Sequence, residues 1–370
     1  MKKEPELLLL IATSARTLLA SAIRGGYSAV VIDGFCDREV RKHAVSSTRV
    51  ALRKEGGLDD DALAEAIKQT SKRYAKSLKT LVFGSGIEGC ETSLEVIRQS
   101  GIKQKGNQHE YRQYSKNKTL ERSSGQIMSM PDNTPPYLYK SVVGSGGVHI
   151  YRDDDYQDIK PDYYRQSYLP LTGISHLFLA DGNQIETVGF SVQWHSKHDA
   201  RHPFCYGGAI SACFLDQSCI AQAEAVAKKF DLIGLNNIDY LYDGSRLYFL
   251  ELNPRPSATM TLYDEDYADG LLHAHIKACE GKGLVRPSKV ASVYRTFAII
   301  YTDKAIKLPN DFEWPIEAKN VPMEDPAGYY FEKNAPICTL HVNADNTVDA
   351  LTCLQNRVRD LQTRIAQTSY

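Results

Sequence analysis

Short continuous blocks of apolar residues dominate the first hundred positions of the chain. Residues 6–12, with the run LLLLIA, and residues 27–33, YSAVVID, are typical of buried strands, and the apolar-periodic stretch between them predicts a helix that ends near Gly25. Strand, helix and strand joined by short loops predict a right-handed crossover in a parallel sheet. A helix-favouring stretch at 59–76 and a third strand with a glycine turn at 80–89 extend the pattern. We therefore expect an open α/β domain whose ligand edge lies at the carboxyl ends of the strands.

A polar stretch separates this part from the next. Residues 103–136 are rich in Lys, Gln, Asn and Ser and end in MPDNTPP, a composition that predicts a boundary with one short helix around 117–125. Residues 136–150, PYLYKSVVGSGGVHI, then predict a strand, a glycine loop and a second strand. The chain therefore changes here from an α/β to an α+β pattern.

Alternating strands dominate the central part. Residues 167–195 predict a hairpin-rich sheet whose turn is the Asp-Gly pair at 181–182. A helix is predicted at 217–230, and residues 238–253 predict two strands joined by the Asp-Gly pair at 243–244. This order predicts a second, mainly antiparallel sheet.

The last ninety residues open with a predicted strand at 291–302 and continue through proline-rich loops and short strands. Apolar residues at helical spacing then predict a helix at 350–365. We interpret this helix as an element packed on the surface of the protein. Binding of a partner helix is the alternative.

The composition excludes several classes of partner. The 370 residues include 44 basic and 45 acidic side chains, so the formal net charge of −1 offers no electrostatic surface for nucleic acid or for an acidic membrane. A charged ligand must therefore be held by a local site, which favours small-molecule substrates.

The cysteines and the first residues bear on the cellular compartment. None of the eight cysteines forms a C-x-x-C pair, and their apolar surroundings indicate reduced thiols. The apolar run at 7–12 is too short to span a bilayer, and Glu4, Glu6 and Arg16 interrupt its likeness to a signal peptide. We therefore expect a cytoplasmic protein.

The stretch FLELNPRP at 249–256 places a carboxylate, a carboxamide and a guanidinium two residues apart. Alternate residues of a strand share a face, so Glu251, Asn253 and Arg255 are predicted to project together until the prolines end the pairing. Asp239 lies on the preceding strand, and the turn brings it back towards Glu251. Two carboxylates and an amide oxygen suit a hard cation such as Mg²⁺ beside phosphate oxygens. A salt bridge between Arg255 and Glu251 is the alternative.

A second cluster lies a hundred residues upstream. Lys140 stands two residues before VVGSGGV at 142–148, a loop whose backbone N–H groups can approach phosphates without obstruction by Cβ atoms. It is not a Walker loop, because no Gly-Lys-Ser/Thr follows and it opens a strand rather than a helix. A polyphosphate site and an ordinary hairpin turn are the two interpretations. The loop residues at issue are Gly144, Ser145, Gly146 and Gly147.

Two weaker patterns leave alternatives open. GSGIEG at 84–89 has the spelling of a dinucleotide-binding loop, but it follows the third strand and no acidic residue ends a following strand, which favours a tight turn over an NAD site. His195, His198 and His202 could share a helix face and bind a transition metal, but Pro203 favours a loop.

The order of these elements resembles that of the ATP-grasp ligases. NKTLERSSG at 117–125 is similar to the segment that opens the family's central domain, which implies that Lys118 reaches the nucleotide phosphates. YLYKSVVGSGGV resembles the family's strand and mobile glycine loop. This resemblance implies that Lys140 lies on the adenine side of the nucleotide and also contacts its phosphates. RQSYLPLTG at 165–173 is similar to the hinge between the two halves of the grasp. The resemblance implies that the adenine pocket is lined by Gln166, Tyr168 and Leu169.

The predicted hairpin adds to the resemblance. Asp239, Glu251 and Asn253 match the family's metal ligands, and ELNPRPS is similar to the E-x-N-x-R form of biotin carboxylase and carbamoyl phosphate synthetase. In that form the arginine that matches Arg255 lies near the acyl phosphate or its attacking partner, which implies a catalytic role. The implied cofactors are ATP and Mg²⁺, with Mn²⁺ as an alternative ion.

The implied activity is that of an ATP-dependent ligase that forms a carbon–nitrogen bond. ATP would phosphorylate a carboxylate, and an amine would attack the acyl phosphate. The tail, with DPAG at 325–328 and PICTLHV at 336–342, resembles a branch of predicted carboligases related to biotin carboxylase, which implies biosynthesis of a methanopterin- or methanofuran-type one-carbon cofactor. After Arg255 the chain reads PSATM where biotin carboxylase has a Gln-Val-Glu run, so carboxylation is less favoured. A bicarbonate-dependent ATP-grasp carboxylase and a non-catalytic ATP-binding protein remain as alternatives.

The resemblance also implies a domain organisation. It places a Rossmann-like pre-ATP-grasp domain at 1–103, a two-lobed α+β ATP-grasp core at 104–280, and a β-rich region with a terminal helix at 281–370. The core would divide into lobes at 104–165 and 166–280. Dimerisation is common in the family, so a homodimer is a further expectation. We expect substrate specificity from three regions: the loop around Ser14, Ala15 and Arg16, the 84–89 turn, and an insert at 193–209.

Overall fold

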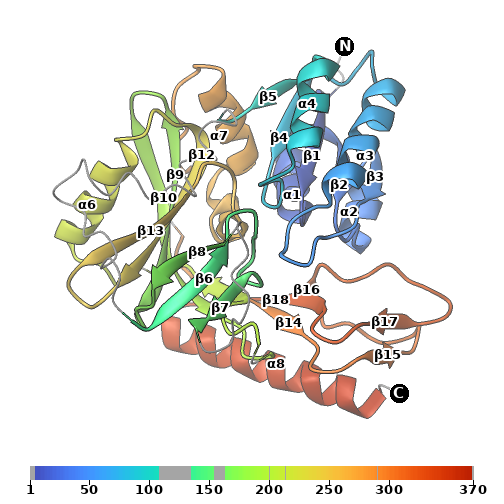
Figure 1. Ribbon diagram of the computed structural model, residues 1–370, viewed down its shortest axis with the longest axis vertical. Helices are drawn as coiled ribbons and strands as arrows, with labels where there is room; N and C mark the ends of the chain where they lie inside the picture. Colours follow the sequence, from blue (N-terminus) through green and yellow to red (C-terminus); the bar gives the residue numbers. More distant parts are fainter. Residues whose placement is uncertain are drawn as a thin grey trace.

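The structure, a computed structural model, describes residues 5–107, 135–153, 163–199, 201–212, 214–289 and 291–368. Figure 1 shows two main sheets, one built from the first hundred residues and one from the later part of the chain. The mixed α/β class predicted from the sequence is confirmed. The predicted helix at 117–125 and the candidate phosphate ligand Lys118 lie outside the described residues.

The N-terminal sheet is parallel, with the strand order β3-β2-β1-β4-β5. Its strands are β1 (Leu7–Ala12), β2 (Ser28–Asp33), β3 (Ser46–Arg49), β4 (Thr80–Phe83) and β5 (Lys103–Lys105). The apolar strands β1, β2 and β4 confirm the prediction. The edge strands β3 and β5 were not predicted, because the short sequences SSTR and KQK have no apolar pattern.

Helices cover both faces of this sheet, as Figure 1 shows. They are α1 (Arg16–Arg24), α2 (Arg38–His43), α3 (Asp60–Arg73) and α4 (Glu91–Ser100). On one face, Ile11 and Ile32 share a core with Ile67 of α3 and Leu94 of α4. On the other face, α1 packs with α7 (Gly270–Cys279), a helix from the central part of the chain. The N-terminal domain therefore shares one apolar core with the sheet that follows.

The larger sheet is antiparallel, in the order β13-β12-β9-β10-β11-β14-β18-β16. Its strands are β9 (Thr172–Asp181), β10 (Ile185–His195), β11 (Tyr206–Ile210), β12 (Ile233–Tyr242), β13 (Leu247–Asn253), β14 (Tyr294–Tyr301), β16 (Ala318–Lys319) and β18 (Pro336–Ala344). Both predicted hairpins are present, and the predicted helix α6 (Gln217–Ala227) packs on one face of the sheet. Because β14 and β18 continue the sheet, it crosses the proposed boundary at 280–281 without interruption.

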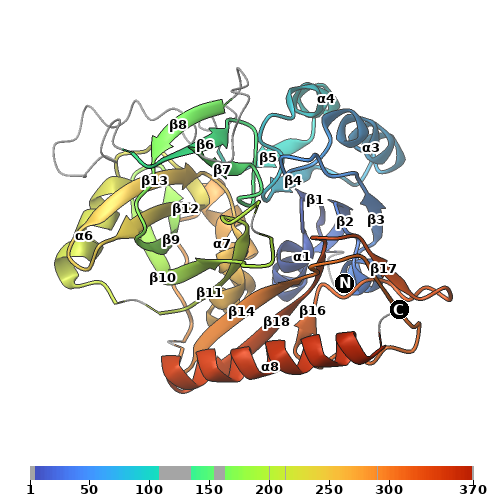
Figure 2. The same ribbon diagram turned by 60° about the horizontal axis from the view of Figure 1, so that its bottom comes forward.

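A three-stranded sheet lies over one end of the larger sheet (Figure 2). It consists of β6 (Tyr137–Ser141), β7 (Ile150–Arg152) and β8 (Tyr163–Ser167), with β6 in the middle and antiparallel to both neighbours. The predicted strand, glycine loop and strand at 136–150 are confirmed. The space between this sheet and β12–β13 is where the polar side chains of the predicted site meet.

The C-terminal helix α8 (Thr347–Thr368) packs along β14 and β18, as Figure 2 also shows. Leu354, Leu361 and Ile365 share a core with Leu340, so this helix is the packed element that the sequence predicted. The remaining elements are the strand pair β15 (Ile306–Leu308) and β17 (Tyr329–Phe331) and the 3₁₀ helices η3 (Ala258–Leu262) and η4 (Asp264–Asp266). Among the described residues, no helix has the length and apolar character needed to cross a membrane. The cysteines among the described residues are free thiols.

Candidate active site

The hairpin of β12 and β13 brings the predicted ligands together. Asp239 pairs with Glu251 across the two strands, Asn237 pairs with Asn253, and the register shifts after Asp239. The amide nitrogen of Asn253 donates to Asp239 Oδ2 at 3.0 Å and to Glu251 Oε1 at 3.2 Å. The turn is fixed locally, because Asp243 Oδ1 accepts two backbone N–H groups of the same turn. The two carboxylates and the amide therefore share one face of the hairpin.

The Asp239 carboxylate is partly buried beside a second carboxylate. Burial, followed by the charge of Glu251, raises the pKa of Asp239 to about 7. Asn237 Nδ2 and Gln193 Nε2 donate to Asp239 Oδ1 at 2.9 and 2.7 Å, and these bonds oppose the rise. A cation between Asp239 and Glu251 would offset the same repulsion, so the pair fits a divalent metal ion.

The donor atoms of this cluster are oxygens, which suit Mg²⁺. Asn253 Oδ1 accepts a hydrogen bond from Arg255 Nη2 at 3.1 Å, so its amide would have to turn to offer oxygen to a metal ion. Within the described ranges, no three His, Cys, Asp or Glu side chains gather as a metal cluster. The fit to a metal ion therefore depends on the two carboxylates, with the carboxamide as an auxiliary ligand.

Lys140 lies on β6, in the sheet above these carboxylates. Its side chain is buried, and burial lowers the pKa of Lys140 while the charges of Glu251 and Asp239 raise it. Tyr164, the neighbour of Lys140 on β8, has its pKa raised by burial and by Glu251. A buried cation and two partly buried carboxylates therefore lie within electrostatic reach of one another between the two sheets. This arrangement can neutralise the charge of a polyphosphate.

Glycine is required at several positions of the loop between β6 and β7. A Cβ atom on Gly144 would lie 2.1 Å from a histidine ring, and one on Gly147 would lie 1.9 Å from the carbonyl oxygen of Phe204. Gly146 and Gly147 have φ angles of 69° and 78°. Gly146 O accepts the backbone N–H of Tyr206 at 3.0 Å. The loop therefore lies against residues 204–206, and its contact with phosphates stays a prediction.

The predicted adenine residues lie at the end of β8. Gln166 is buried in the three-stranded sheet. The ring of Tyr168 meets the edge of Phe204 at 5.5 Å, and the Arg152 guanidinium lies 5.7 Å from the centre of the Tyr168 ring. Leu169 follows directly. Tyr168 thus shares Phe204 with the glycine loop, which places the predicted adenine and phosphate segments side by side.

Arg255 meets a carboxylate of the N-terminal domain. Its Nε donates to Glu88 Oε1 at 2.6 Å, and the two side chains are only 16% and 12% exposed. The alternative salt bridge between Arg255 and Glu251 is wrong, because within the described residues the ion pair of Arg255 is with Glu88. The sequence pointed to the turn at 84–89 but not to Glu88 itself, since the partners are 167 positions apart.

The turn that contains Glu88 is closely packed. Gly86 has a φ angle of 94°, and a Cβ atom there would lie 1.8 Å from Thr13 Oγ1. Glu88 Oε2 accepts the backbone N–H of Gly86 at 2.7 Å. The glycines of GSGIEG therefore permit close packing and a turn, as the tight-turn interpretation predicted, and one of the N–H groups is already bound by Glu88.

A family model described as an ATP-grasp domain matches residues 111–259. The chain contains an ATP-grasp domain. The matched range includes Lys140, the glycine loop, Asp239, Glu251 and Asn253, so the side chains that meet between the two sheets belong to this domain.

Several solved structures share the overall fold of this chain. Biotin carboxylase from Campylobacter jejuni, in a β-γ-ATP complex, has a TM-score of 0.69 at 15% identity over 94% of this chain and 89% of its own. The biotin carboxylase domain of Hydrogenobacter thermophilus 2-oxoglutarate carboxylase has a TM-score of 0.69 at 13% identity over 100% of this chain and 91% of its own. N5-carboxyaminoimidazole ribonucleotide synthetase, as its ADP complex, has a TM-score of 0.64 at 13% identity over 98% of this chain and 100% of its own. No curated protein sequence matches the chain significantly. At these identities the likeness establishes the fold alone.

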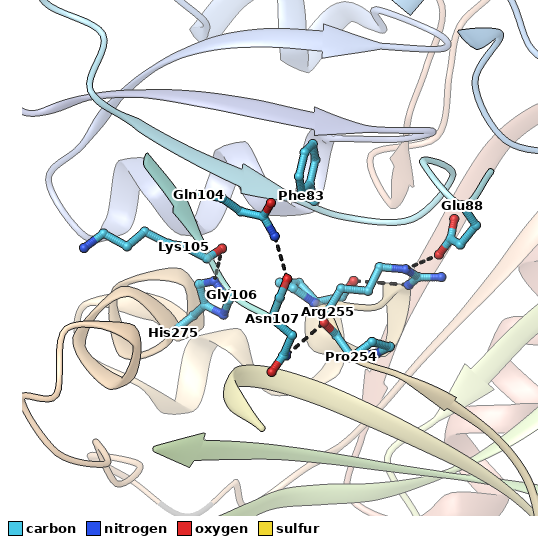
Figure 3. Close-up of a pocket in the computed structure, with 10 residues that line it drawn as sticks. Phe83, Glu88, Gln104, Lys105, Gly106, Asn107, Pro254, Arg255 and His275 are labelled. Carbon is cyan, nitrogen blue, oxygen red and sulfur yellow. Dashed lines mark hydrogen bonds and ion pairs between the residues drawn. The ribbon is translucent and has the colours of Figure 1, made fainter. Parts of the chain in front are cut away.

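The ATP-grasp domain meets the N-terminal domain at a pocket beside Arg255 (Figure 3). Asn107 joins the two sides of this pocket, because its Nδ2 donates to Pro254 O at 3.0 Å and to Asn236 Oδ1 at 2.7 Å. The lining residues are Phe83, Glu88, Gln104, Lys105, Gly106, Asn107, Pro254, Arg255, Pro256 and His275. Arg255 therefore has the β12–β13 hairpin with its two carboxylates on one side and a pocket between domains on the other.

His275 is one of the residues that line this pocket. Its Nδ1 accepts the backbone N–H of Leu235 at 2.8 Å, so Nε2 holds the proton and donates to Lys105 O at 3.2 Å. Burial lowers the pKa of His275 to about 4. This histidine is thus a neutral link between the end of β5 and the start of β12.

Both ends of the segment at 193–209 belong to the main sheet. Residues 206–210 form β11, which pairs with β10 and β14 in the main sheet. The histidines of this segment have separate partners: His195 packs against Phe204, His198 stacks on Tyr301, and His202 binds Asp199. This arrangement does not support the alternative of a transition-metal site.

Proposed function

We propose that this protein is an ATP-dependent ligase that joins a carboxylate to an amine through an acyl phosphate. The observation that supports the proposal most is the position of Arg255. It lies between the carboxylates of the ATP-grasp hairpin and the pocket of the N-terminal domain. A substrate carboxylate bound at this guanidinium would be next to the cleft proposed for the phosphates of ATP.

The first step would transfer the γ-phosphoryl group of ATP to the carboxylate. Asp239, Glu251 and Asn253 would hold Mg²⁺, which neutralises charge on phosphate oxygens when it is bound. Lys140, and in our proposal Lys118, would offset the remaining phosphate charge. A carboxylate oxygen forms a bond to the γ-phosphorus, and the bond to the β-phosphate oxygen breaks to release ADP.

The second step would form the carbon–nitrogen bond. The amine nitrogen attacks the acyl carbon, phosphate leaves with its oxygen, and the amine loses a proton to solvent. Arg255 would bind the carboxylate first and the acyl phosphate afterwards, because its planar guanidinium can donate two parallel hydrogen bonds. The loop of Gly144, Ser145, Gly146 and Gly147 would cover the intermediate and exclude water. In this proposal Gln166, Tyr168 and Leu169 hold the adenine ring.

A bicarbonate-dependent carboxylase is the second candidate, and one solved structure with this fold supports it. The Hydrogenobacter thermophilus structure that shares this fold was obtained with MgADP and bicarbonate. After Arg255 this chain continues with Pro256 and Ser257, and Ser257 Oγ is bound to Thr259 Oγ1 at 2.8 Å. These residues differ from the Gln-Val-Glu run of biotin carboxylase, so we place the carboxylase second.

We extend the proposal in three respects. The resemblance of the tail supports a role in the biosynthesis of a methanopterin- or methanofuran-type one-carbon cofactor. Free thiols among the described residues support a cytoplasmic location. The Hydrogenobacter thermophilus structure is described as a dimer, which supports a homodimer here. The proposed domains are 1–103, 104–280 and 281–370.

The direct test measures release of ADP and phosphate from ATP. Wild-type protein and Glu251→Ala are incubated with Mg²⁺ or Mn²⁺ and ATP, against a panel of acids and amines, with and without bicarbonate. Glu95→Ala is the matched control, because Glu95 lies on the exposed side of α4, where it pairs with Arg98.

A ligase requires one acid and one amine for phosphate release, and Glu251→Ala abolishes release while Glu95→Ala does not. Release that depends on bicarbonate without an amine would replace the ligase by the carboxylase. Tight ATP binding without turnover under every combination would favour a non-catalytic ATP-binding protein.

A further inference from the structure

A turn of the N-terminal domain, residues 53–57, contacts both the glycine loop and the turn that contains Glu88. Arg53 Nη2 donates to the carbonyl oxygen of Glu88 at 2.6 Å and to that of Val143 at 3.3 Å. Val143 lies directly before the first glycine of the ATP-grasp loop. One guanidinium group therefore joins two segments that belong to different domains.

The surrounding backbone leaves space for this contact. A Cβ atom on Gly57 would lie 2.7 Å from Arg53 Nη2, and one on Gly89 would lie 2.6 Å from Val143 Cγ1. Both glycines have positive φ angles, 86° and 76°. Side chains at these two positions would displace either the guanidinium or the glycine loop, so the contact depends on glycine on both sides.

The same turn also binds the glycine loop through its backbone. Ser145 N donates to Glu55 O at 3.1 Å. Gly56, with a φ angle of 81°, approaches so closely that a Cβ atom there would lie 2.4 Å from Ser145 O. The loop proposed to cover the phosphates is therefore docked on the N-terminal domain.

Through Glu88, Arg53 is also connected to Arg255 and Asn253. The Glu88 side chain binds Arg255 Nε at 2.6 Å, and Arg255 Nη2 binds Asn253 Oδ1 at 3.1 Å. A continuous series of hydrogen bonds thus runs from Val143 through Arg53, Glu88 and Arg255 to Asn253. Arg53 is the member that contacts the glycine loop.

We propose that Arg53 is a positioning residue that holds the Glu88 turn and the glycine loop together, so that Arg255 is in place when the loop lies over the cleft. The planar guanidinium carries several N–H donors and can bind two carbonyl oxygens at once. Its Nε is buried with no hydrogen-bond partner among the described residues, so the group is held by its Nη2 contacts. This inference rests on the proposed function of the cleft.

The first arm of the test needs no acid or amine substrate. The probe is a fluorescent ATP analogue with Mg²⁺, and the readout is its dissociation rate. For Arg53→Ala we expect dissociation about tenfold faster than for wild type, because charge-assisted hydrogen bonds that hold the loop are lost. Arg53→Lys, which keeps the charge and can reach one carbonyl, should recover part of the loss. Arg49→Ala is the matched control, since Arg49 of the same domain also donates to a backbone carbonyl, that of Gly34.

A second pair of variants tests the docking without changing the guanidinium. Gly56→Ala should speed dissociation in the same direction, because its Cβ meets Ser145 O. Gly26→Ala is its control, since Gly26 also has a positive φ angle, 77°, but a Cβ there meets nothing within 4 Å. Thermal midpoints measured on all variants separate a loss of stability from a change in dissociation.

The second arm uses the acid and amine identified by phosphate release. Arg53→Ala should raise the amount of phosphate released per molecule of product, because a loosely held loop admits water to the acyl phosphate. Equal dissociation rates and equal product ratios in Arg53→Ala and Arg49→Ala would overturn the positioning role and leave the proposed function intact. A wild-type protein that binds no nucleotide probe would overturn the proposed function, and this inference with it.

Discussion

Arg295 and Arg255 each form an ion pair with a carboxylate that is at most 12% exposed, but the two guanidinium groups distribute their hydrogen bonds differently. Arg295 faces Asp266 as a fork, with Nη2 to Oδ1 at 2.7 Å and Nη1 to Oδ2 at 2.8 Å, and Nη1 also donates to Leu262 O at 2.6 Å. Its hydrogen bond to Asp266 raises the pKa of Arg295. This pair joins β14 to the 3₁₀ helix η4, and neither residue lines the pocket beside Arg255.

Arg255 divides its hydrogen bonds among several segments. Nε binds Glu88 of the N-terminal domain at 2.6 Å, Nη2 binds Asn253 of its own strand at 3.1 Å, and Nη1 reaches Pro256 O at 3.4 Å. One side of this guanidinium lines the pocket between domains. The contrast indicates that an arginine whose planar fork is matched by one carboxylate stabilises the fold. An arginine whose bonds are divided among several segments beside a pocket is available to a ligand.

The largest expected effect is on turnover at Arg255. Arg255→Met should lower the rate of product formation about 10³-fold, because a preorganised positive group at the acyl phosphate is lost. The thermal midpoint should change by no more than a few degrees, since Glu88 keeps its bond to Gly86 N. Steady-state kinetics on the substrate pair from the phosphate assay, together with a melting curve, measure both quantities. Unchanged turnover would remove Arg255 from the reaction.

The next effect is on stability at Arg295. Arg295→Met should lower the free energy of unfolding by about 3 to 5 kcal/mol, because the Asp266 carboxylate is left buried without its partner. The nucleotide affinity of the folded fraction should stay at the wild-type value. Urea denaturation and nucleotide titration at low temperature measure the two properties.

Two further variants complete that experiment. Asp266→Leu combined with Arg295→Met should recover part of the lost stability, since both charges are then removed. Arg24→Ala removes a third arginine–carboxylate pair, in which Arg24 is 39% exposed and binds Asp264 at 3.2 Å. That change should cost less than about 1 kcal/mol, because solvent screens the exposed partner. A loss at Arg24 as large as that at Arg295 would refute the comparison.

The smallest expected effect is a loss of stability at low pH, caused by protonation of His275 in the pocket beside Arg255. His275 is neutral in the fold with a pKa of about 4, below the ordinary value near 6.5, so the unfolded chain binds more protons between these values. The contribution to stability is fully present above about pH 6.5 and is lost as the pH falls towards 4, by at most about 3 kcal/mol. Thermal midpoints from pH 7.5 to 4.5 measure the loss.

His275→Asn is the matched variant for this measurement. Its side-chain oxygen can still accept the N–H of Leu235, but it has no proton to gain in this range. The variant should start with lower stability and lose less on acidification. Equal slopes in the two proteins would show that other buried histidines, such as His176 and His341, dominate the acid response.

The site that the sequence predicted best is the one built from neighbouring residues. Asp239 and Glu251 are joined by a single turn, and the two-residue period of strands fixes which side chains share a face, so their meeting followed from spacing. The glycine loop and the position of Lys140 on the strand before it were likewise predicted from neighbouring residues. The edge strands β3 and β5 were missed because hydrogen bonds from neighbouring strands, rather than apolar residues, determine them.

The partner of Arg255 could not be found by spacing. Glu88 and Arg53 lie in two separate loops of the N-terminal domain, and only the packing of that domain on the ATP-grasp domain brings them to Arg255 and Val143. The strand in the segment at 193–209 could not be predicted for a similar reason. Its strand β11 is completed by β14, nearly ninety positions later in the chain.

The sequence by itself determined the elements and the local chemistry: a parallel α/β domain, a hairpin with two carboxylates, a lysine before a glycine loop, and a packed C-terminal helix. These depend on hydrophobic period and on turns, which act over a few residues. The tertiary structure alone decided that Arg255 pairs with Glu88, that Arg53 holds the glycine loop, and that one sheet continues from the ATP-grasp domain into the C-terminal region. Those contacts join residues far apart in the chain, and their geometry is set by how whole domains pack rather than by any local pattern.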